Sequence, residues 1–339
     1  MIRYSTVGLL YTRTCPLACR HCIIESSPKA TEKMTQALAS EYIKVVPKYS
    51  DQLCFTGGEP LLYYNEILPL IRQAKELGLG VSLVTGAGWV TLAKPHIARE
   101  RIRLIKEAGL DALVVSWDSY HEEFSPPENA LLVVESAKEV GLSVQVRGVM
   151  SATGPLPRIE QKLVSIDVKY QKQNILRLGS AATLPEDHFI FGGIPKTGGC
   201  GTIFQPVVEP DGKVYACCGP SRSSRSETSP LILGDTAHES LDSIFERATN
   251  DPILEAIATI GPHALFNLIK DDPELVGVLP IRERYTGICE LCLDMNDVPA
   301  VVNKLRARVS ESQVSRLITA LRLYHQSSPE LRAEVQCPM

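Results

Sequence analysis

Three cysteines, Cys15, Cys19 and Cys22, stand close together near the start of the chain, in the run Cys-Pro-Leu-Ala-Cys-Arg-His-Cys. An iron–sulfur cube held by three thiolates keeps one iron open to a ligand from outside the protein. The rival occupant is zinc, but a closed structural zinc site takes four ligands. No fourth cysteine lies nearby in the sequence, and His21, next to Cys22, is poorly placed to join them. The spacing therefore favours an iron–sulfur cluster with an open iron.

A second set of cysteines lies later in the chain and comprises Cys200, Cys217, Cys218, Cys289 and Cys292. A Pro-Asp-Gly turn between residues 204–209 and 213–217 predicts a hairpin that returns Cys217 towards Cys200. The Cys289-Glu-Leu-Cys292 pair offers two more thiols, and four soft ligands suit zinc or an iron–sulfur cluster. Cys218 follows Cys217 in a strand, where alternation points it to the opposite side.

The ten cysteines of the 339-residue chain indicate either a disulfide framework or metal and redox chemistry. The first apolar run, residues 7–11, is too short for a secretory signal. No run reaches the roughly 18 apolar residues of a membrane span. We therefore expect a cytoplasmic protein with reduced thiols and no membrane partner. Its 35 Lys and Arg against 39 Asp and Glu, a net charge of −4, argue against a nucleic-acid partner.

Short β-rich runs alternate with amphipathic helical stretches over about residues 6–180. The expected strands are 6–11, 52–55, 80–85, 112–117, 143–149 and 174–178, and two of the helices are 65–77 and 97–108. Such alternation gives a parallel sheet, and functional groups are then expected at the carboxyl ends of its strands. Residues 221–229, which are rich in serine, predict a flexible surface loop without chemistry. The chain from residue 299 onward is expected to be helical.

Two motifs at expected strand ends resemble those of the radical SAM superfamily. The Cys15-x3-Cys19-x2-Cys22 motif follows the first strand, and Gly57-Gly58-Glu59-Pro60 follows the second. The resemblance covers about residues 5–180 and implies a partial (β/α)6 TIM barrel. It also implies a [4Fe–4S] cluster whose open iron binds S-adenosylmethionine. One electron then cleaves this cofactor to a 5′-deoxyadenosyl radical, which abstracts a hydrogen atom from the substrate.

The Gly-Gly-Glu motif fits such a cofactor on physical grounds. Gly57 and Gly58 allow a ligand to approach the backbone closely, and Glu59 can accept a hydrogen bond from an ammonium group. Thr85, in Thr85-Gly86-Ala87-Gly88 after the third strand, offers a second place for close approach or an ordinary turn.

Further polar residues lie at the next strand ends. The resemblance implies that Ser116 and Asp118 contact the ribose of the cofactor. It implies that Arg147 pairs with the methionine carboxylate, to which a guanidinium is suited. Each of the three is also compatible with a purely structural role, and His121 is read as a loop residue or as one facing substrate.

The spacing from Cys200 through Gly212 to Cys217 resembles the start of the SPASM module, which houses two auxiliary clusters. The chain departs from that module because Val298 stands where the next cysteine is expected. The shortened pattern resembles the twitch module and implies one auxiliary [4Fe–4S] cluster, with zinc as the alternative. Its ligands are expected to be Cys200, Cys217, Cys289 and Cys292. With four ligands no iron is open, which favours electron transfer or structural support.

We therefore expect an α/β protein of three segments: a radical SAM core at 1–190, an auxiliary-cluster module with a β-hairpin and a helix at 191–298, and a helical segment at 299–339. Cys54 is expected to be a buried, inert thiol in the second strand, and Cys337 a thiol of the tail without a role.

The resemblance to radical SAM peptide-modifying enzymes implies a peptide substrate and a flavodoxin- or ferredoxin-type reductant. Cys218 can return a hydrogen atom to a substrate radical, which favours epimerisation of a Cα from L to D. The alternatives are thioether or carbon–carbon cross-linking of a peptide and oxidation of a small carbohydrate-like substrate. These must dispose of an electron, whereas epimerisation must supply a hydrogen atom. A noncatalytic iron–sulfur scaffold is the alternative from a different class.

Overall fold

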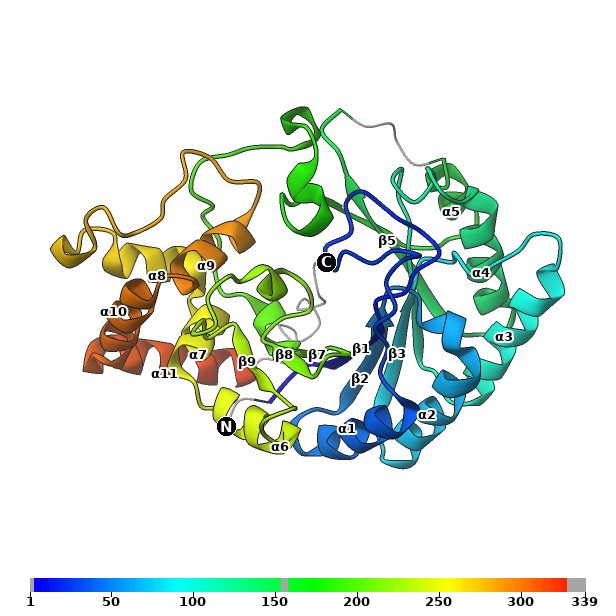
Figure 1. Cartoon of the computed structure of the whole chain (residues 1–339), viewed down its shortest axis with the longest axis horizontal. Coiled ribbons are helices and arrows are strands. Elements are labelled where there is room, and N and C mark those ends of the chain that lie inside the picture. The colour runs from blue at the N-terminus through cyan, green and yellow to red at the C-terminus, as the bar shows by residue number, and fades with distance from the viewer. Residues whose placement is uncertain (1–2, 154–157, 328–339) are drawn as a thin grey trace. The chain divides into compact units, whose positions relative to one another are not determined.

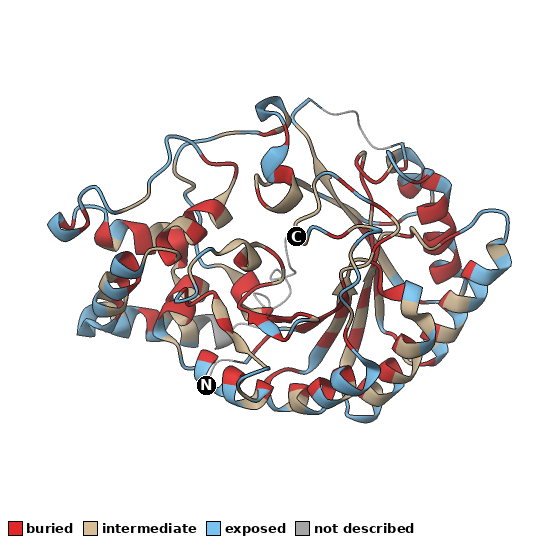
Figure 2. Cartoon of the chain, viewed as in Figure 1, coloured by how far each residue is buried: buried red, intermediate tan, exposed pale blue. Residues whose placement is uncertain are grey.

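The computed structural model describes residues 3–153 and 158–327 (Figure 1). The chain divides into two compact units. The first contains Ser5–Ile190 and Val208–Gly212, and the second contains Met1–Tyr4, Phe191–Val207 and Lys213–Met339. Each unit is described by itself below. Buried residues gather on the strands and on the faces of the helices that pack against them (Figure 2).

The first unit is built on six parallel strands in the order β6-β5-β4-β3-β2-β1. The strands are β1 (Val7–Thr12), β2 (Gln52–Gly57), β3 (Gly80–Thr85), β4 (Ala112–Ser116), β5 (Ser143–Met150) and β6 (Tyr170–Asn174). The helices between them are α1 (Gln36–Tyr49), α2 (Tyr64–Glu76), α3 (Pro95–Glu107), α4 (Pro127–Glu139) and α5 (Glu160–Ser165). They lie along the outer side of the curved sheet (Figure 1). The short helices η1 (Pro60–Tyr63), η2 (Gly179–Thr183) and η3 (Glu186–His188) complete the unit. This is the mostly parallel α/β sheet that the sequence predicts.

One row of apolar side chains runs across four strands of this sheet. Leu9 pairs in register with Phe55, Phe55 with Leu83, and Leu83 with Leu113, and all four are fully buried. Strands covered on both faces are apolar along their whole length, as all six buried residues of β1 show. This row fixes the register that brings the carboxyl ends of the strands together.

The sixth strand is where the sequence prediction is wrong. We expected it at residues 174–178, but β6 is the polar run Tyr170–Asn174, which pairs with β5. The apolar residues that suggested a strand, Ile175 and Leu178, are buried in the segment that follows it. An edge strand pairs on one side only, so its own sequence carries little of the apolar signal that marks a central strand.

The second unit contains short strands and a group of helices. These are η4 (Gly201–Phe204), β8 (Lys213–Tyr215), η5 (Pro220–Ser223), β9 (Ile232–Asp235), α6 (Leu241–Ala248), α7 (Pro252–Thr259), α8 (Gly261–Ile269), η6 (Pro273–Leu275), α9 (Ile288–Asn296), α10 (Pro299–Ser310) and α11 (Ser312–Ser327). Strand β8 pairs antiparallel with β9. The last two helices confirm the predicted helical segment as far as residue 327.

The predicted Pro-Asp-Gly turn is present, with Gly212 at φ +89° and its amide donating to the Glu209 carbonyl at 3.0 Å. The strands flanking it, β7 (Val207–Val208) and β8, are shorter than the predicted 204–209 and 213–217. Among the described residues, no single helix is long and apolar enough to cross a membrane. One pair, Pro252–Thr259 with Gly261–Ile269, meets the length and composition together but is bent by 115°.

Candidate active site

The loop between β1 and α1 carries Cys15, Cys19 and Cys22. Backbone amides point at two of the thiols: Leu17 N donates to Cys15 Sγ and Ser26 N donates to Cys22 Sγ, each at 3.4 Å. The amide of Cys22 also donates to the Cys19 carbonyl at 3.0 Å, which closes a turn between these two cysteines. The donor at Cys15 opposes the effect of burial on the pKa of that thiol, although burial outweighs it.

The three thiols lie near enough to act on one another. Burial, together with the charges of Glu59 and Cys22, raises the pKa of the Cys15 thiol to about 12. Burial also raises the pKa of Cys19 far above its usual value, with added repulsion from Asp118, Cys22 and Cys15. Buried thiolates that repel one another are stabilised by a cationic group between them. The donor set therefore fits an iron–sulfur cluster.

The Gly-Gly-Glu segment after β2 packs on the backbone that leads into the cysteine loop. Gly58 N donates to Thr12 O at 2.6 Å, and Glu59 N donates to Thr14 O at 2.9 Å. A Cβ on Gly57, which has φ +143°, would meet Thr12 O at 2.4 Å, and a Cβ on Gly58 would meet Thr14 O at 2.3 Å. These two glycines are thus needed because the protein's own backbone passes too close to leave room for a Cβ. The approach of a ligand here stays a prediction.

Glu59 joins the ends of β2 and β3. Its side chain is fully buried; Oε1 accepts from Leu61 N at 3.1 Å, and Oε2 accepts from Thr85 Oγ1 at 2.8 Å and Gly86 N at 3.0 Å. Burial raises the pKa of this carboxyl group to about 7, although the three hydrogen bonds lower it. Thr85 is also engaged, since its hydroxyl accepts from Trp89 Nε1 at 3.1 Å. A bond from Glu59 to an ammonium group stays a prediction.

Asp118, just after β4, holds two histidines. Its Oδ1 lies 2.8 Å from His121 Nδ1, and its Oδ2 lies 3.3 Å from His21 Nε2. Three backbone amides, of Tyr120 at 3.1 Å, His121 at 3.2 Å and Val149 at 3.0 Å, also donate to this carboxylate. Burial raises the pKa of Asp118, but the two histidines and these donors lower it more, so the net shift is downward. Every described contact of Asp118 is within the protein, and its predicted ribose contact stays a prediction.

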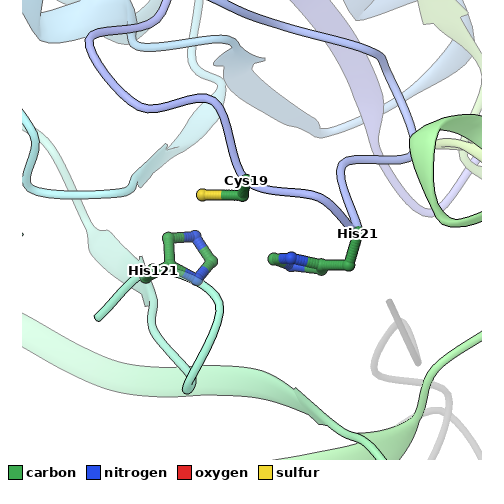
Figure 3. A group of neighbouring side chains, drawn as sticks. All are labelled: Cys19, His21 and His121. Atoms are coloured by element: carbon green, nitrogen blue, oxygen red, sulfur yellow. The ribbon is translucent and has the colours of Figure 1, made fainter. Parts of the chain in front are cut away.

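The same two histidines lie beside the cysteine loop. The Sγ atom of Cys19 and one ring nitrogen each of His21 and His121 all lie within 4.8 Å of one another (Figure 3). His21 is thus nearer to a thiol than its place in the sequence suggested, because Asp118 draws its ring inward. Burial lowers the pKa of His21 to about 4, and the nearby Asp118 opposes that shift.

Ser116, the last residue of β4, pairs in register with Arg147, which lies within β5. The Nε atom of Arg147 is buried and finds no hydrogen-bond partner among the described residues. Buried donors are almost always satisfied, so this N–H indicates a missing acceptor. A carboxylate is the acceptor that a guanidinium binds best. Arg147 therefore fits the carboxylate of a bound amino-acid-like cofactor.

In the second unit four thiols come together. Burial raises the pKa of Cys292 well above its usual value, and the charges of Cys200, Cys289 and Cys217 raise it further. Helix α9 contributes Cys289 and Cys292 one turn apart, on one face. The arrangement fits a group held by four soft ligands.

Two polar residues support these thiols, and one of them corrects the sequence prediction. We expected Ser221 in a flexible surface loop, but it is buried in η5. Its amide donates to Cys217 Sγ at 3.3 Å, and its hydroxyl donates to Cys217 O at 2.9 Å. Asn296 Nδ2 donates to Cys292 O at 2.8 Å. Serine-rich composition predicts mobility, but a serine whose hydrogen bonds are all made by its own turn is as well suited to burial.

The remaining cysteines are placed as follows. Cys54 lies in β2 as predicted, but it is half-buried rather than buried. Cys218 is also half-buried, and Cys337 lies outside the described residues. Within the described residues, none of the cysteines forms a disulfide.

Comparison with known proteins agrees with this geometry. Residues 9–155 match the Radical SAM superfamily. YydG of Bacillus subtilis (strain 168), a protein named for peptide biosynthesis, is 22% identical over 298 residues, which span 85% of this chain and 91% of YydG. PqqA peptide cyclase of Rhodopseudomonas palustris is 31% identical over 116 residues, 33% of this chain and 28% of the cyclase. A solved structure of anSMEcpe with bound AdoMet has a TM-score of 0.53 at 15% identity and spans 98% of both chains.

Proposed function

We propose that this chain, which carries a radical SAM domain at residues 9–155, modifies a peptide by hydrogen-atom abstraction from carbon, with epimerisation of a Cα from L to D as the outcome. The alignment with YydG, which is named for peptide biosynthesis, spans 85% of this chain and 91% of YydG, and this supports a peptide substrate. The observation that carries the proposal is the division of the second-unit cysteines. The charges of Cys200, Cys217 and Cys289 act on Cys292, and Cys218 directly follows Cys217 in the sequence, which leaves a fifth thiol as candidate hydrogen donor.

The family implies a [4Fe–4S] cluster and S-adenosylmethionine, and the first unit offers residues for both. When bound, this pair supplies the reductive cleavage that yields a hydrogen-abstracting radical. Cys15 and Cys19, which are buried, and Cys22, which is half-buried, would hold the cluster and limit its contact with water. The unpartnered N–H of Arg147 would bind the methionine carboxylate, with Ser116 beside it for the ribose.

Cys218 would complete the reaction as hydrogen-atom donor. A planar Cα radical of the peptide takes the hydrogen of the Cys218 S–H group on its other face, so that a C–H bond forms and the S–H bond breaks. The sulfur radical left on Cys218 then takes one electron from a flavodoxin- or ferredoxin-type reductant and one proton from water, which restores the thiol. The peptide therefore changes configuration without a change in composition. Cys200, Cys217, Cys289 and Cys292 would hold one auxiliary cluster, which serves electron transfer or support.

The test uses full-length reconstituted protein with S-adenosylmethionine, dithionite and small peptides encoded beside its gene. Epimerisation predicts no change of peptide mass in ordinary water and one added deuteron in heavy water, with a D-residue detected after hydrolysis. Cross-linking predicts the loss of two hydrogens instead. Cys218→Ala should abolish the D-residue while 5′-deoxyadenosine still forms, and Cys54→Ala serves as the matched control that keeps the product.

Three results would overturn parts of the proposal. A D-residue formed at the parental rate by Cys218→Ala removes Cys218 as the donor. A peptide lighter by two hydrogens replaces epimerisation by cross-linking. Iron near four per chain together with one zinc, rather than about eight iron, removes the auxiliary cluster.

A further inference from the structure

One group of side chains at the cysteine loop joins a proposed cluster ligand to two histidines that have no part in the proposed reaction. It consists of Cys19, His21 and His121, whose ligand atoms all lie within 4.8 Å of one another. The side chains of the two histidines are 13% and 10% exposed, and Cys19 is 8% exposed. They converge from two segments, the cysteine loop and the loop after β4 (Figure 3). A buried thiol and two imidazoles at this separation form a recognisable donor set for a metal ion.

Asp118 orients both imidazoles with one carboxylate. His121 meets Asp118 through Nδ1 at 2.8 Å, which leaves its Nε2 available. His21 meets Asp118 through Nε2 at 3.3 Å, which leaves its Nδ1. That Nδ1 atom is buried and has no hydrogen-bond partner among the described residues. Imidazoles that bind metal commonly place their second nitrogen against a carboxylate, which fixes the ring and makes the ligating nitrogen more basic.

We propose that Cys19, His21 and His121 form a site for a single divalent transition-metal ion, Zn²⁺ above all, with Asp118 holding the two imidazoles from behind. One thiolate and two imidazoles are ligands that zinc prefers, and three protein ligands leave a fourth position for water. Zinc bonds of about 2.3 Å to sulfur and 2.0 Å to nitrogen put tetrahedral ligand atoms roughly 3.3–3.6 Å apart. The ligand atoms lie within 4.8 Å of one another, so an ion would have to draw them together by about 1 Å.

The shared ligand gives this site a consequence. Cys19 cannot serve both a mononuclear ion and a three-cysteine cluster, so the two occupants exclude each other. A chain that holds zinc here is an inactive form, which must release the ion before the cluster is built. This competition rests on the proposed function, whereas the ion site itself rests only on the three side chains and Asp118.

The binding test uses full-length protein freed of metal by a chelator under reducing, anaerobic conditions, with Co²⁺ as the spectroscopic probe. We expect two Co²⁺ per chain, one on the four thiols of the second unit and one on Cys19, His21 and His121. His21→Gln and His121→Gln should each reduce this to one, with loss of the weaker thiolate-to-cobalt absorption. Asp118→Asn should weaken the second site by about 10- to 100-fold. Cys15→Ala is the matched control and should still bind two.

The outcomes separate the ion site from the cluster. If His21→Gln and His121→Gln both bind two Co²⁺ like the parent, the site does not exist. If Cys15→Ala loses the ion as the histidine variants do, the ion lies on the three cysteines and the assignment is wrong. Circular dichroism of each variant checks its fold, and Asp118→Asn, which keeps its shape, gives an independent reading. Preloading with Zn²⁺ should slow the reconstitution of the cluster in the parent but not in His121→Gln, which supports the competition. Equal rates in the two proteins refute it. Failure to build any cluster, with the second Co²⁺ retained, refutes the proposed function alone.

Discussion

Gly58→Ala is the sharpest test of why the Gly-Gly-Glu segment needs glycine. A Cβ at residue 58 would lie 2.3 Å from Thr14 O, 2.7 Å from Thr14 C and 2.8 Å from Arg13 O. All three atoms are backbone, so no side chain can turn away to make room. The segment from Arg13 to Thr14 must therefore move, and it leads directly into Cys15.

The size of the effect follows from two contributions. Forcing a methyl group into a packed site costs about 1–3 kcal/mol. The displacement also breaks the bond from Glu59 N to Thr14 O, which contributes about 1 kcal/mol. The sum is about 2–4 kcal/mol, and for a unit of this size each kcal/mol lowers the Tm by roughly 2–4 °C. We therefore expect the Tm to fall by about 4–16 °C.

The assay is thermal unfolding followed by circular dichroism, together with iron content after reconstitution. Gly193→Ala is the matched control, because a Cβ at residue 193 would meet nothing within 4 Å. We expect Gly193→Ala to keep the parental Tm and iron content, and Gly58→Ala to lose stability and iron together. If Gly58→Ala has the same Tm as Gly193→Ala, the backbone of Thr14 does not require a glycine at residue 58. If only cofactor binding is lost, the glycine serves the ligand instead.

Three further predictions follow from the described contacts. Burial raises the pKa of Glu59 to about 7, whereas a glutamate in an unfolded chain has a pKa of roughly 4.3. The free energy of unfolding should therefore fall, by on the order of 3 kcal/mol, as pH rises between these two values. The Tm of Glu59→Gln minus the Tm of the parent should therefore be larger at pH 8 than at pH 5. A difference that does not change with pH contradicts this. Arg147→Ala should leave the Tm nearly unchanged, because its Nε has no protein partner, yet weaken S-adenosylmethionine binding by about 10- to 150-fold in equilibrium dialysis, with Arg158→Ala as the control. Ser221→Ala removes the hydroxyl bonds to the Cys217 backbone and should lower stability by about 1–2 kcal/mol in urea unfolding, whereas an unchanged midpoint would mean that the η5 turn holds without them.

The central strands and two helix ends were predictable because their signals are local. Strand β3 begins and ends at the predicted residues, and α2 and α3 each end two residues before a glycine, Gly78 and Gly109, which have φ +79° and +103°. Central strands need apolar residues throughout, and a helix end needs a residue that tolerates positive φ. Both requirements can be recognised from a few adjacent residues in the sequence.

The contacts within the site were harder to predict because they join distant segments. The carboxylate of Asp118 holds His21 from nearly a hundred residues earlier, and no spacing marks that pair. Polar residues at strand ends suggested contacts with a ligand, yet Glu59 and Asp118 bond to the protein in the structure. Only the fold shows which polar side-chain atoms at the strand ends already have hydrogen-bond partners within the protein. Arg147 was the exception, since its Nε has no protein partner.

The four thiols of the second unit come from segments that are far apart in the chain, Cys200 at one end and Cys292 at the other. Any group bound by all four ties the ends of a loop of about 90 residues, as a covalent cross-link would. Closing a loop of that length removes conformational entropy from the unfolded chain worth about 4–5 kcal/mol at 25 °C. Loading the thiols is therefore a step of folding as well as of cofactor assembly. A chelator that strips them should loosen α9 and the η5 turn together.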